Sequence, residues 1–265
     1  MRSPSAPPGL AVVTGASAGI GAALAARLSR AGRPVLAVAR REDRLVALAG
    51  AARAGGCAPI HPLAADVAGE GTVARIAERA NELGGAAWLV NNAGFGYHGP
   101  FESQDPGRLA NLVRLNCEAV VLLTHALLPQ LSASQQGVVL NVASAAAFQP
   151  TPFMSVYGAS KAFVLSFSEG LAEELRDAGI FVGAYCPGPV ATEFGEVAGT
   201  RDRLDVVPQV LSAEDAADEA LAQIARREVV FVPKALYRFA TAASRFLPRS
   251  VIRRLSARAH WPEST

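Results

Sequence analysis

The sequence is poor in features that bind metal ions, form disulfides or attract polyanions. Its three cysteines, Cys57, Cys117 and Cys186, stand far apart among 265 residues, and none belongs to a Cys-x-x-Cys or Cys/His metal-binding pattern. We therefore expect no metal site, and a reducing compartment, the cytoplasm, as the location. The formal net charge is only +2, which gives no general reason to expect nucleic acid as a partner.

Long apolar runs are also absent. Residues 1–8 contain no apolar stretch of the kind found in secretion signals, and no apolar run approaches the roughly 18 residues that cross a membrane. We expect neither a secretion signal nor a membrane-spanning helix. Apolar residues nevertheless make up 51% of the chain, which is enough for a sizeable core, and the length suits one domain over residues 1–265.

Short apolar runs alternate with helix-forming segments along most of the chain. The runs are typical of buried strands, and the segments between them carry the apolar spacing of helices. This alternation predicts an α/β fold: a doubly wound parallel sheet with helices on both faces and ligands at the carboxyl ends of the strands. We predict strands at residues 10–14, 34–39, 58–65, 88–91, 137–143, 180–186 and 228–232.

A glycine-rich turn follows the first predicted strand. Gly15, Gly19 and Gly21 lie between that strand and a predicted helix that ends near Arg30. Glycine lets the backbone turn tightly and approach a pyrophosphate, and the N–H groups at a helix N-terminus can bind it. The spacing is Gly-x-x-x-Gly-x-Gly rather than Gly-x-Gly-x-x-Gly, but its context of strand, turn and helix still predicts a dinucleotide site. The alternative is a plain tight connection between strand and helix.

The residues after the second predicted strand bear on which dinucleotide binds. Sites for NAD place an acidic residue about 20 positions after the glycines to accept the ribose hydroxyls, whereas this chain has Ala39 and Arg40 there. An arginine can bind a 2′-phosphate that a carboxylate would repel, which predicts NADP(H). Alternatively, Arg40 and Arg41 merely begin the next helix. Asp66, after the third strand, can accept from the adenine amino group or cap the following helix.

Tyr157 and Lys161 lie four residues apart in a helix-forming run, so they share one helix face. A phenol has an unperturbed pKa of about 10, and a cation one turn away favours the phenolate. The pair therefore predicts a phenol that gives or takes a proton near pH 7 to 8. Ser144 follows the fifth predicted strand, and its hydroxyl can donate to a substrate oxygen beside the tyrosine. The alternative is a surface tyrosine and lysine that share a helix by chance.

Polar side chains also occur within two other apolar segments of the sequence. Asn91 and Asn92 end the fourth predicted strand, and two adjacent amides in a buried sheet need partners. We expect them to tie neighbouring strands together and to let Gly94 pass close to a cofactor. Asn116 stands among leucines in a helix predicted at residues 108–128, and its amide needs a water, a backbone carbonyl or a relay as its partner.

Taken together, these motifs resemble the short-chain dehydrogenase/reductase family. The resemblance covers roughly residues 8–233 and shows no departure at a catalytic position. It implies a Rossmann-type fold, hydride transfer between a nicotinamide and a carbonyl or alcohol, and a homodimer or homotetramer. The matching residues are Thr14, Gly15, Ala16, Ser17, Ala18, Gly19, Ile20, Gly21, Asp66, Asn91, Asn92, Ala93, Gly94, Asn116, Ser144, Tyr157, Lys161, Pro187, Gly188 and Thr192.

The resemblance also implies a role for each matching side chain. Tyr157 would be the acid/base, Lys161 would lower its pKa and hold the nicotinamide ribose, and Ser144 would orient the substrate oxygen. Asn116 would support a water in a proton relay behind Lys161, and Arg40 would bind the 2′-phosphate. The implied cofactor contacts are Gly15, Ser17, Gly19, Ile20, Arg40, Asp66, Val67, Asn92, Ala93, Gly94, Tyr157, Lys161, Pro187, Gly188, Val190 and Thr192.

Our first hypothesis for the function is NADPH-dependent reduction of an apolar ketone or aldehyde, such as a 3-oxoacyl, steroid-like or xenobiotic carbonyl. The alternatives are oxidation of an alcohol with NADP+ and a sensor that binds NADPH with little turnover. A pure binder would not need the phenol. An apolar pocket is predicted by side chains that stand near the motifs: Phe95, Tyr97, Phe148, Pro152, Phe153, Met154 and Phe194.

Two segments lack the regular pattern. Residues 193–212 mix Gly, Asp, Arg and Pro without periodicity, which is typical of a lid over an active site or of a mobile loop. The tail at residues 234–265 holds seven Lys or Arg against one acid, Glu263, with apolar residues between them. Such a basic amphipathic tail can lie on an anionic membrane surface or pack as a helical extension on the subunit or its partner. We favour packing.

Overall fold

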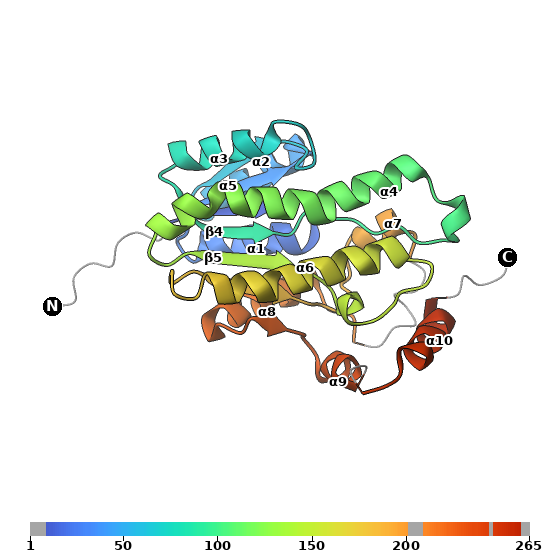
Figure 1. Cartoon of the computed structure of the whole chain (residues 1–265). Coiled ribbons are helices and arrows are strands. Elements are labelled where there is room, and N and C mark those ends of the chain that lie inside the picture. The colour runs from blue at the N-terminus through green and yellow to red at the C-terminus, as the bar shows by residue number, and fades with distance from the viewer. Residues whose placement is uncertain (1–8, 201–208, 244–245, 261–265) are drawn as a thin grey trace.

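A parallel β-sheet forms the centre of the computed structural model, which describes residues 9–200, 209–243 and 246–260 (Figure 1). Its strands are β1 (Leu10–Thr14), β2 (Val35–Ala39), β3 (Ile60–Ala64), β4 (Ala86–Asn91), β5 (Val138–Val142), β6 (Phe181–Tyr185) and β7 (Val230–Phe231). In this part of the chain the seven strands pair in the order β3-β2-β1-β4-β5-β6-β7, and every pair is parallel. The predicted doubly wound parallel sheet is confirmed.

Helices cover both faces of the sheet. Successive side chains of a strand point to opposite faces, so a strand that is apolar throughout needs packing partners on both sides. In β1, Ala11 and Val13 pack on the first face, and Leu10 and Val12 pack on the second. The helices of the first face are α1 (Gly19–Arg30), α2 (Glu42–Ala54) and α8 (Ala213–Arg226), and those of the second face are α3 (Thr72–Glu82), α5 (Ala119–Ala133) and α6 (Ser155–Glu174).

A long helix runs from Pro106 to Ala133 in three parts: α4 (Pro106–Val113), a π-helical turn η2 (Arg114–Glu118), and α5. Among the described residues it is the one helix whose length and composition would suffice to cross a membrane. Leu123, Leu127 and Leu131 are fully buried against the sheet, however. We therefore interpret this helix as part of the core.

Polar side chains join the carboxyl ends of β1, β4 and β5. Asn91 Nδ2 donates to Asn141 Oδ1 at 2.8 Å and to Thr124 Oγ1 at 3.0 Å. Asn92 Nδ2 donates to the Thr14 carbonyl at 2.9 Å, and the Asn92 N–H donates to the Thr14 hydroxyl at 3.0 Å. The two amides tie neighbouring strands as predicted. They do so where β1 and β4 meet and the strand order reverses, which is where open α/β sheets bind ligands.

The segment after β6 is more regular than the sequence predicts. It forms a short helix, α7 (Phe194–Ala198), and Val190 pairs with Leu211 in an isolated parallel bridge. The Ala191 N–H donates to the Leu211 carbonyl at 2.8 Å. The predicted lid at residues 193–212 thus begins as a helix and is fixed near its far end, while its residues 201–208 lie outside the described part of the chain.

The basic tail forms two helices, α9 (Ala235–Ala243) and α10 (Arg249–His260), after the last strand (Figure 1). Helix α9 contacts η3 (Ala145–Phe148), the short helix that follows β5. Ile252 of α10 is buried, whereas Phe239 of α9 is 74% exposed. The tail therefore packs on the subunit with one side and leaves apolar side chains open on the other. Arg245 lies outside the described residues.

Candidate active site

A cleft of about 1680 Å³ lies at the carboxyl ends of the strands. Three of the four catalytic candidates, Ser144, Tyr157 and Lys161, line this cleft. The structure therefore brings these three side chains to one cleft, although their roles in catalysis stay predictions. Every residue predicted to contact a cofactor also lines it: Gly15, Ser17, Gly19, Ile20, Arg40, Asp66, Val67, Asn92, Ala93, Gly94, Tyr157, Lys161, Pro187, Gly188, Val190 and Thr192.

Backbone geometry explains the three glycines of the turn after β1. Gly15 and Gly19 have φ values of 68° and 53°, which favour glycine. A Cβ atom at Gly21 would lie 2.4 Å from Asn92 Nδ2 and 2.5 Å from the Gly15 carbonyl oxygen, so no side chain fits there. No side chain caps the start of α1, so its first N–H groups can bind a ligand. Turn and helix together fit a pyrophosphate.

Tyr157 and Lys161 lie one turn apart near the N-terminus of α6, and both are almost fully buried. Lys161 Nζ lies 5.8 Å from the centroid of the Tyr157 ring and donates to the Val142 carbonyl at 2.8 Å. That carbonyl belongs to the last residue of β5, two positions before Ser144. The end of one strand therefore places the ammonium and the serine hydroxyl beside the phenol.

Burial controls the pKa values of both side chains. It raises the pKa of Tyr157 to about 12, and a hydrogen bond with the Ser144 hydroxyl opposes that shift. Burial also lowers the pKa of Lys161 to about 8. The prediction that the lysine brings the pKa of this phenol close to neutrality is therefore wrong, because lost hydration of the phenolate outweighs the attraction. The phenol keeps its proton at neutral pH and can act as a donor.

Asn116 lies behind the cleft and reaches the site through hydrogen bonds. From the π-helical turn η2, its Nδ2 donates to the Phe95 carbonyl and to Ser160 Oγ, each at 3.0 Å. Ser160 Oγ in turn donates to the Tyr157 carbonyl at 2.7 Å. A Cβ atom at Gly94 would lie 2.9 Å from Asn116 Oδ1, which explains the glycine. The amide thus joins the segment after β4 to the helix that carries Tyr157.

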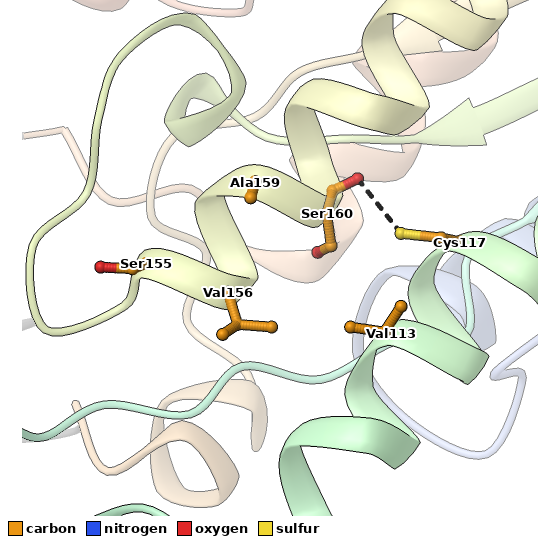
Figure 2. Close-up of a pocket in the computed structure, with 6 residues that line it drawn as sticks. All are labelled: Val113, Cys117, Ser155, Val156, Ala159 and Ser160. Carbon is orange, nitrogen blue, oxygen red and sulfur yellow. Dashed lines mark hydrogen bonds between the residues drawn. The ribbon is translucent and has the colours of Figure 1, made fainter. Parts of the chain in front are cut away.

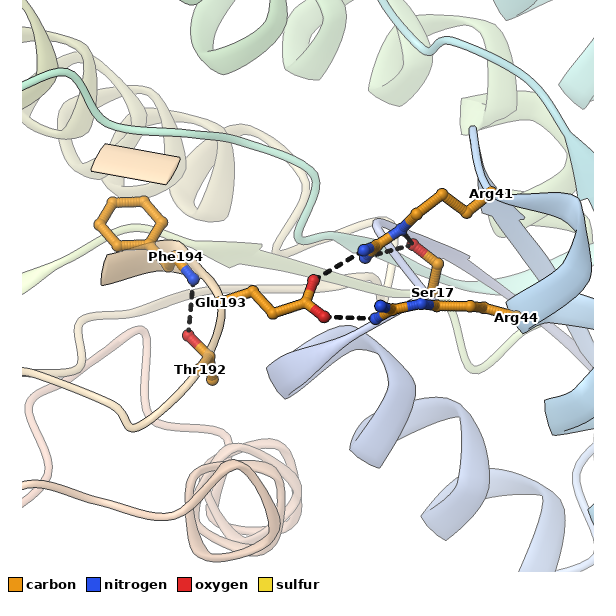
Figure 3. Close-up of polar contacts among 6 residues, drawn as sticks. All are labelled: Ser17, Arg41, Arg44, Thr192, Glu193 and Phe194. Carbon is orange, nitrogen blue, oxygen red and sulfur yellow. Dashed lines mark hydrogen bonds and ion pairs between the residues drawn. The ribbon is translucent and has the colours of Figure 1, made fainter. Parts of the chain in front are cut away.

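Arginines gather beside the glycine turn. Arg40 and Arg41 follow β2 and line the cleft, and Arg41 donates to Ser17 Oγ from Nε at 3.2 Å and from Nη2 at 3.1 Å. Arg41 Nη1 also donates to Glu193 Oε2 at 2.7 Å, and Arg44 binds the other oxygen of that carboxylate (Figure 3). These guanidinium groups form a cationic patch that suits an anionic ligand.

Asp66 lines the cleft and also closes a turn. Its Oδ1 accepts from the Ala68 N–H at 3.1 Å, in the turn that precedes α3. The N-cap residue of α3 is Gly71, so the carboxylate does not cap that helix. Of the two roles that the sequence leaves open, the adenine contact remains compatible with this position.

Apolar side chains line one end of the cleft. Phe95, Met154 and Phe194 lie there as predicted, and the Phe194 ring centroid lies 5.4 Å from that of Tyr157. Four other side chains predicted for this pocket are not among the described residues that line it: Tyr97, Phe148, Pro152 and Phe153.

Contacts with the scaffold account for three of these corrections. The Tyr97 hydroxyl accepts from the Asp105 N–H at 3.3 Å, and Phe148 packs in an apolar cluster with Val164. Phe153 has a φ of 65°, and its carbonyl accepts from the Gly99 N–H at 2.9 Å. Proximity in the sequence to a catalytic motif therefore did not decide which way these side chains point.

The tail contributes to the same cleft. Tyr237, Ala240 and Thr241 of α9 and Arg258 of α10 line it. A Cβ atom at Gly188 would lie 2.7 Å from Tyr237 Cε2, so the turn after β6 is in close contact with α9. The tail thus packs on the subunit and also forms part of the wall of the site.

Three positions of the site were not identified from the sequence. Ser160 stands between Tyr157 and Lys161, but its contact with Asn116 arises only in the folded chain. Glu193 follows Thr192 in a segment without periodicity, and Tyr237 belongs to a tail whose apolar spacing does not say what it covers. All three residues belong to the site because they lie near its other residues in the folded chain, and no local sequence pattern shows this.

The chain is similar to known proteins over most of its length. Residues 9–202 match the family model described as short chain dehydrogenase. A very-long-chain 3-oxoacyl-CoA reductase of Anas platyrhynchos is 34% identical over 201 residues, which are 72% of this chain and 64% of that protein. The chain spans 60 to 64% of the length of the first curated relatives that it matches.

Solved structures match over nearly the whole chain. A short-chain dehydrogenase from Sphingobium yanoikuyae in complex with NADPH superposes with a TM-score of 0.81 and 33% sequence identity, over 97% of this chain and 98% of that chain. The bulky-bulky ketone specific alcohol dehydrogenase from Comamonas testosteroni superposes with a TM-score of 0.78 and 32% identity, over 91% of this chain and 93% of that chain.

Proposed function

Because the chain belongs to the short-chain dehydrogenase family and is an oxidoreductase of that family, we propose that it reduces a lipophilic carbonyl to an alcohol with NADPH. One observation carries the proposal: the protonated, buried hydroxyl of Tyr157 lies in the same cleft as the glycine turn after β1. That arrangement puts a proton donor beside a dinucleotide site. A module that only bound the dinucleotide would have no use for such a donor.

The residues that line the cleft support a nicotinamide dinucleotide as its ligand. The glycine turn and the start of α1 would hold the pyrophosphate, and Asp66 and Val67 would flank the adenine. Pro187, Gly188 and Thr192 would hold the nicotinamide end. A bound nicotinamide supplies the hydride, which no side chain of the protein can provide.

The side chains of the cleft would activate the carbonyl. Its oxygen would accept hydrogen bonds from the Tyr157 and Ser144 hydroxyls, and the phenol would give its proton to that oxygen as negative charge develops there. The raised pKa of Tyr157 retains the proton until an alkoxide, a stronger base than a phenolate, takes it. Lys161, cationic below about pH 8, would stabilise the phenolate that remains.

The protonation state of Tyr157 suits the proton transfer that carbonyl reduction requires. Oxidation of an alcohol needs a base, and here the base would be the phenolate, which burial disfavours. Reduction needs the neutral phenol, which is the form present at neutral pH.

The charge beside the glycine turn supports NADP(H) over NAD(H). Arg40 and Arg41 line the cleft next to Ser17, and guanidinium groups bind phosphate oxygens with paired hydrogen bonds. The solved structure from Sphingobium yanoikuyae, which this chain resembles over 97% of its length, contains NADPH.

The apolar end of the cleft supports a lipophilic substrate. Phe95, Met154 and Phe194 line it, and Tyr237 of the tail lies beside the turn at Gly188. Burial of apolar substrate surface against such side chains favours binding. The names of two similar proteins, one acting on bulky ketones and one on very-long-chain 3-oxoacyl-CoA, fit the same substrate class.

An exposed apolar face on the second helix layer supports a homo-oligomer. A hollow of about 360 Å³ lies there, between the α4–η2 segment and α6 (Figure 2). Val113 at its rim is 47% exposed, and Phe163, one turn beyond Ala159 of the hollow, is 44% exposed. A second copy of the chain would cover this surface and fill the hollow with apolar side chains.

Replacement of Tyr157 by Phe tests the proposed function. The variant keeps the ring but loses the proton donor, so we expect NADPH oxidation to slow about 100- to 10,000-fold over a panel of carbonyls graded by chain length and ring count. NADPH binding, followed by fluorescence titration, should change little. Tyr97→Phe is the matched control, because its hydroxyl accepts from the Asp105 N–H outside the cleft. A Tyr157→Phe enzyme that kept a substantial part of its rate would contradict the assignment.

A further inference from the structure

A carboxylate of the protein itself occupies the cationic patch beside the glycine turn. Arg41 Nη1 binds Glu193 Oε2 at 2.7 Å, and Arg44 Nη1 binds Glu193 Oε1 (Figure 3). The two arginines follow β2, whereas the glutamate follows β6, so the ion pairs join segments about 150 positions apart across the cleft. The three side chains are 38 to 45% exposed, which leaves them accessible to a ligand.

Arg41 lines the cleft beside Arg40, the residue predicted to bind a 2′-phosphate, and Arg41 is the one of the two that contacts the glycine turn. Arg41 donates from Nε and Nη2 to Ser17 Oγ in the glycine turn and from Nη1 to Glu193. All three of these donors are therefore engaged inside the protein. A phosphate that bound Arg41 beside Ser17 would replace the carboxylate on the guanidinium, because two anions a few ångström apart on one cation repel each other.

We propose that Glu193 is a specificity-determining residue that competes with the 2′-phosphate of the cofactor for Arg41. The inference rests on the proposed NADP(H) dependence and deepens it. Binding of the phosphorylated dinucleotide displaces Glu193 from Arg41, and Arg44 can keep one carboxylate oxygen. A dinucleotide without the 2′-phosphate leaves the ion pairs in place. Glu193 therefore weakens the binding of NADP(H) but not of NAD(H), and so makes the preference for NADP(H) smaller.

The electrostatics of the pair agree with this competition. Arg44 and Arg41 hold the pKa of the Glu193 carboxyl below its usual range, so the carboxylate is fully charged at neutral pH. Exposed ion pairs are weak, however, and salt screens them. A phosphate with up to two negative charges is therefore a stronger ligand for Arg41 than the single carboxylate.

Removal of the glutamate charge is the direct test. We would titrate wild type and Glu193→Gln with adenosine 2′,5′-bisphosphate and with 5′-AMP by calorimetry at low salt, which needs no turnover. The Kd of the bisphosphate should fall about two- to five-fold in Glu193→Gln, the range expected from loss of one exposed ion pair. The Kd of 5′-AMP should stay the same, because that ligand has no 2′-phosphate.

Asp218→Asn provides the matched control. Asp218 binds Arg27 with both carboxylate oxygens, at 2.7 and 3.0 Å, in an exposed pair between α1 and α8. Its loss removes the same net charge from the protein as Glu193→Gln. We expect it to leave the Kd values of both ligands unchanged, so a general effect of net charge would show itself here.

The possible outcomes separate the inference from the proposed function. An unchanged or higher Kd of the bisphosphate in Glu193→Gln overturns the competition. If the Kd values of both ligands rise equally, the ion pairs instead hold the two sides of the cleft together. Wild type that does not prefer the bisphosphate over 5′-AMP contradicts NADP(H) dependence. If Glu193→Gln then gains that preference, competition by Glu193 still stands.

Discussion

Lys161 carries its charge at a position where burial disfavours it. The side chain is 6% exposed, and its pKa of about 8 lies below the ordinary value of 10.5. The pKa of Lys161 is lower in the folded protein than in the unfolded chain, so the unfolded chain binds this proton more readily. The free energy of unfolding therefore decreases as the pH falls from about 10.5 to about 8. At neutral pH the protein therefore keeps a cation beside Tyr157 at the expense of folding free energy, as expected of a functional group.

This shift predicts the pH dependence of carbonyl reduction. Tyr157 stays protonated to about pH 12, so the proton donor persists, whereas Lys161 loses its charge above about pH 8. We expect kcat/KM to be level below pH 7 to 8 and to fall as the pH rises through about 8, because the neutral amine no longer stabilises the phenolate. Initial rates over this pH range would measure the fall.

Lys161→Arg provides the control for that pH profile. A guanidinium stays charged throughout the range, so whatever activity remains should no longer fall near pH 8. Titration of NADPH binding over the same range would show whether cofactor binding contributes to the loss. A fall near pH 8 that persists in Lys161→Arg would assign it to another group.

At the scale of elements, the turn between β1 and α1 is fixed by contacts that only glycine permits. A methyl group at Gly21 would lie 2.5 Å from the Gly15 carbonyl oxygen, which is backbone and cannot rotate away. We expect Gly21→Ala to lower the free energy of unfolding by about 1 to 3 kcal/mol, the usual effect of overpacking, and to weaken dinucleotide binding. Urea denaturation would measure the change.

Gly50→Ala is the opposite case and serves as the control. Gly50 lies inside α2, and a Cβ atom there would meet nothing within 4 Å. Alanine is a better helix former than glycine, so the free energy of unfolding should rise by about 0.5 to 1 kcal/mol without effect on binding. Equal losses of stability in both variants would contradict the role of close packing at Gly21.

The strands and most helices could be predicted from the sequence because their signals are local. The apolar run at residues 10–14 and the glycines after it occur where β1 and its turn are found. The π-helical turn η2 was not predicted, since the apolar spacing of residues 108–128 also fits a regular α-helix. That turn places Asn116 between Phe95 and Ser160, contacts that depend on packing between elements.

The pKa of Tyr157 likewise depends on contacts that the local sequence does not show. Spacing along a helix correctly placed Lys161 one turn from Tyr157. It could not show that both groups are buried, nor that the ammonium binds the Val142 carbonyl. The sign of the pKa shift depends on this burial, so the sequence predicts the participants and the structure decides the protonation state.

At the scale of the whole molecule, two exposed apolar regions bear on assembly. One is the α4–α6 face with Val113 and Phe163, and the other is the tail, where Phe239 is 74% exposed. The face on α6 is also hollowed, and the rings of Phe163 and Phe167 stack with centroids 6.2 Å apart. A hollow and a stacked aromatic pair on the same helix offer shape complementarity to a second copy, which favours this face as the subunit interface.

Phe163→Glu should therefore convert an oligomer into a monomer. Association would bury the new carboxylate without a partner, at a penalty of several kcal/mol that no small rearrangement offsets. Size-exclusion chromatography with light scattering would give the mass of wild type and variant at equal concentration. Phe239→Glu, which adds the same charge to the tail, should leave the assembly intact if the α4–α6 face is the interface. Dissociation caused by Phe239→Glu, with Phe163→Glu still oligomeric, would move the interface to the tail, and the substrate cleft that α9 lines would then lie at the subunit contact.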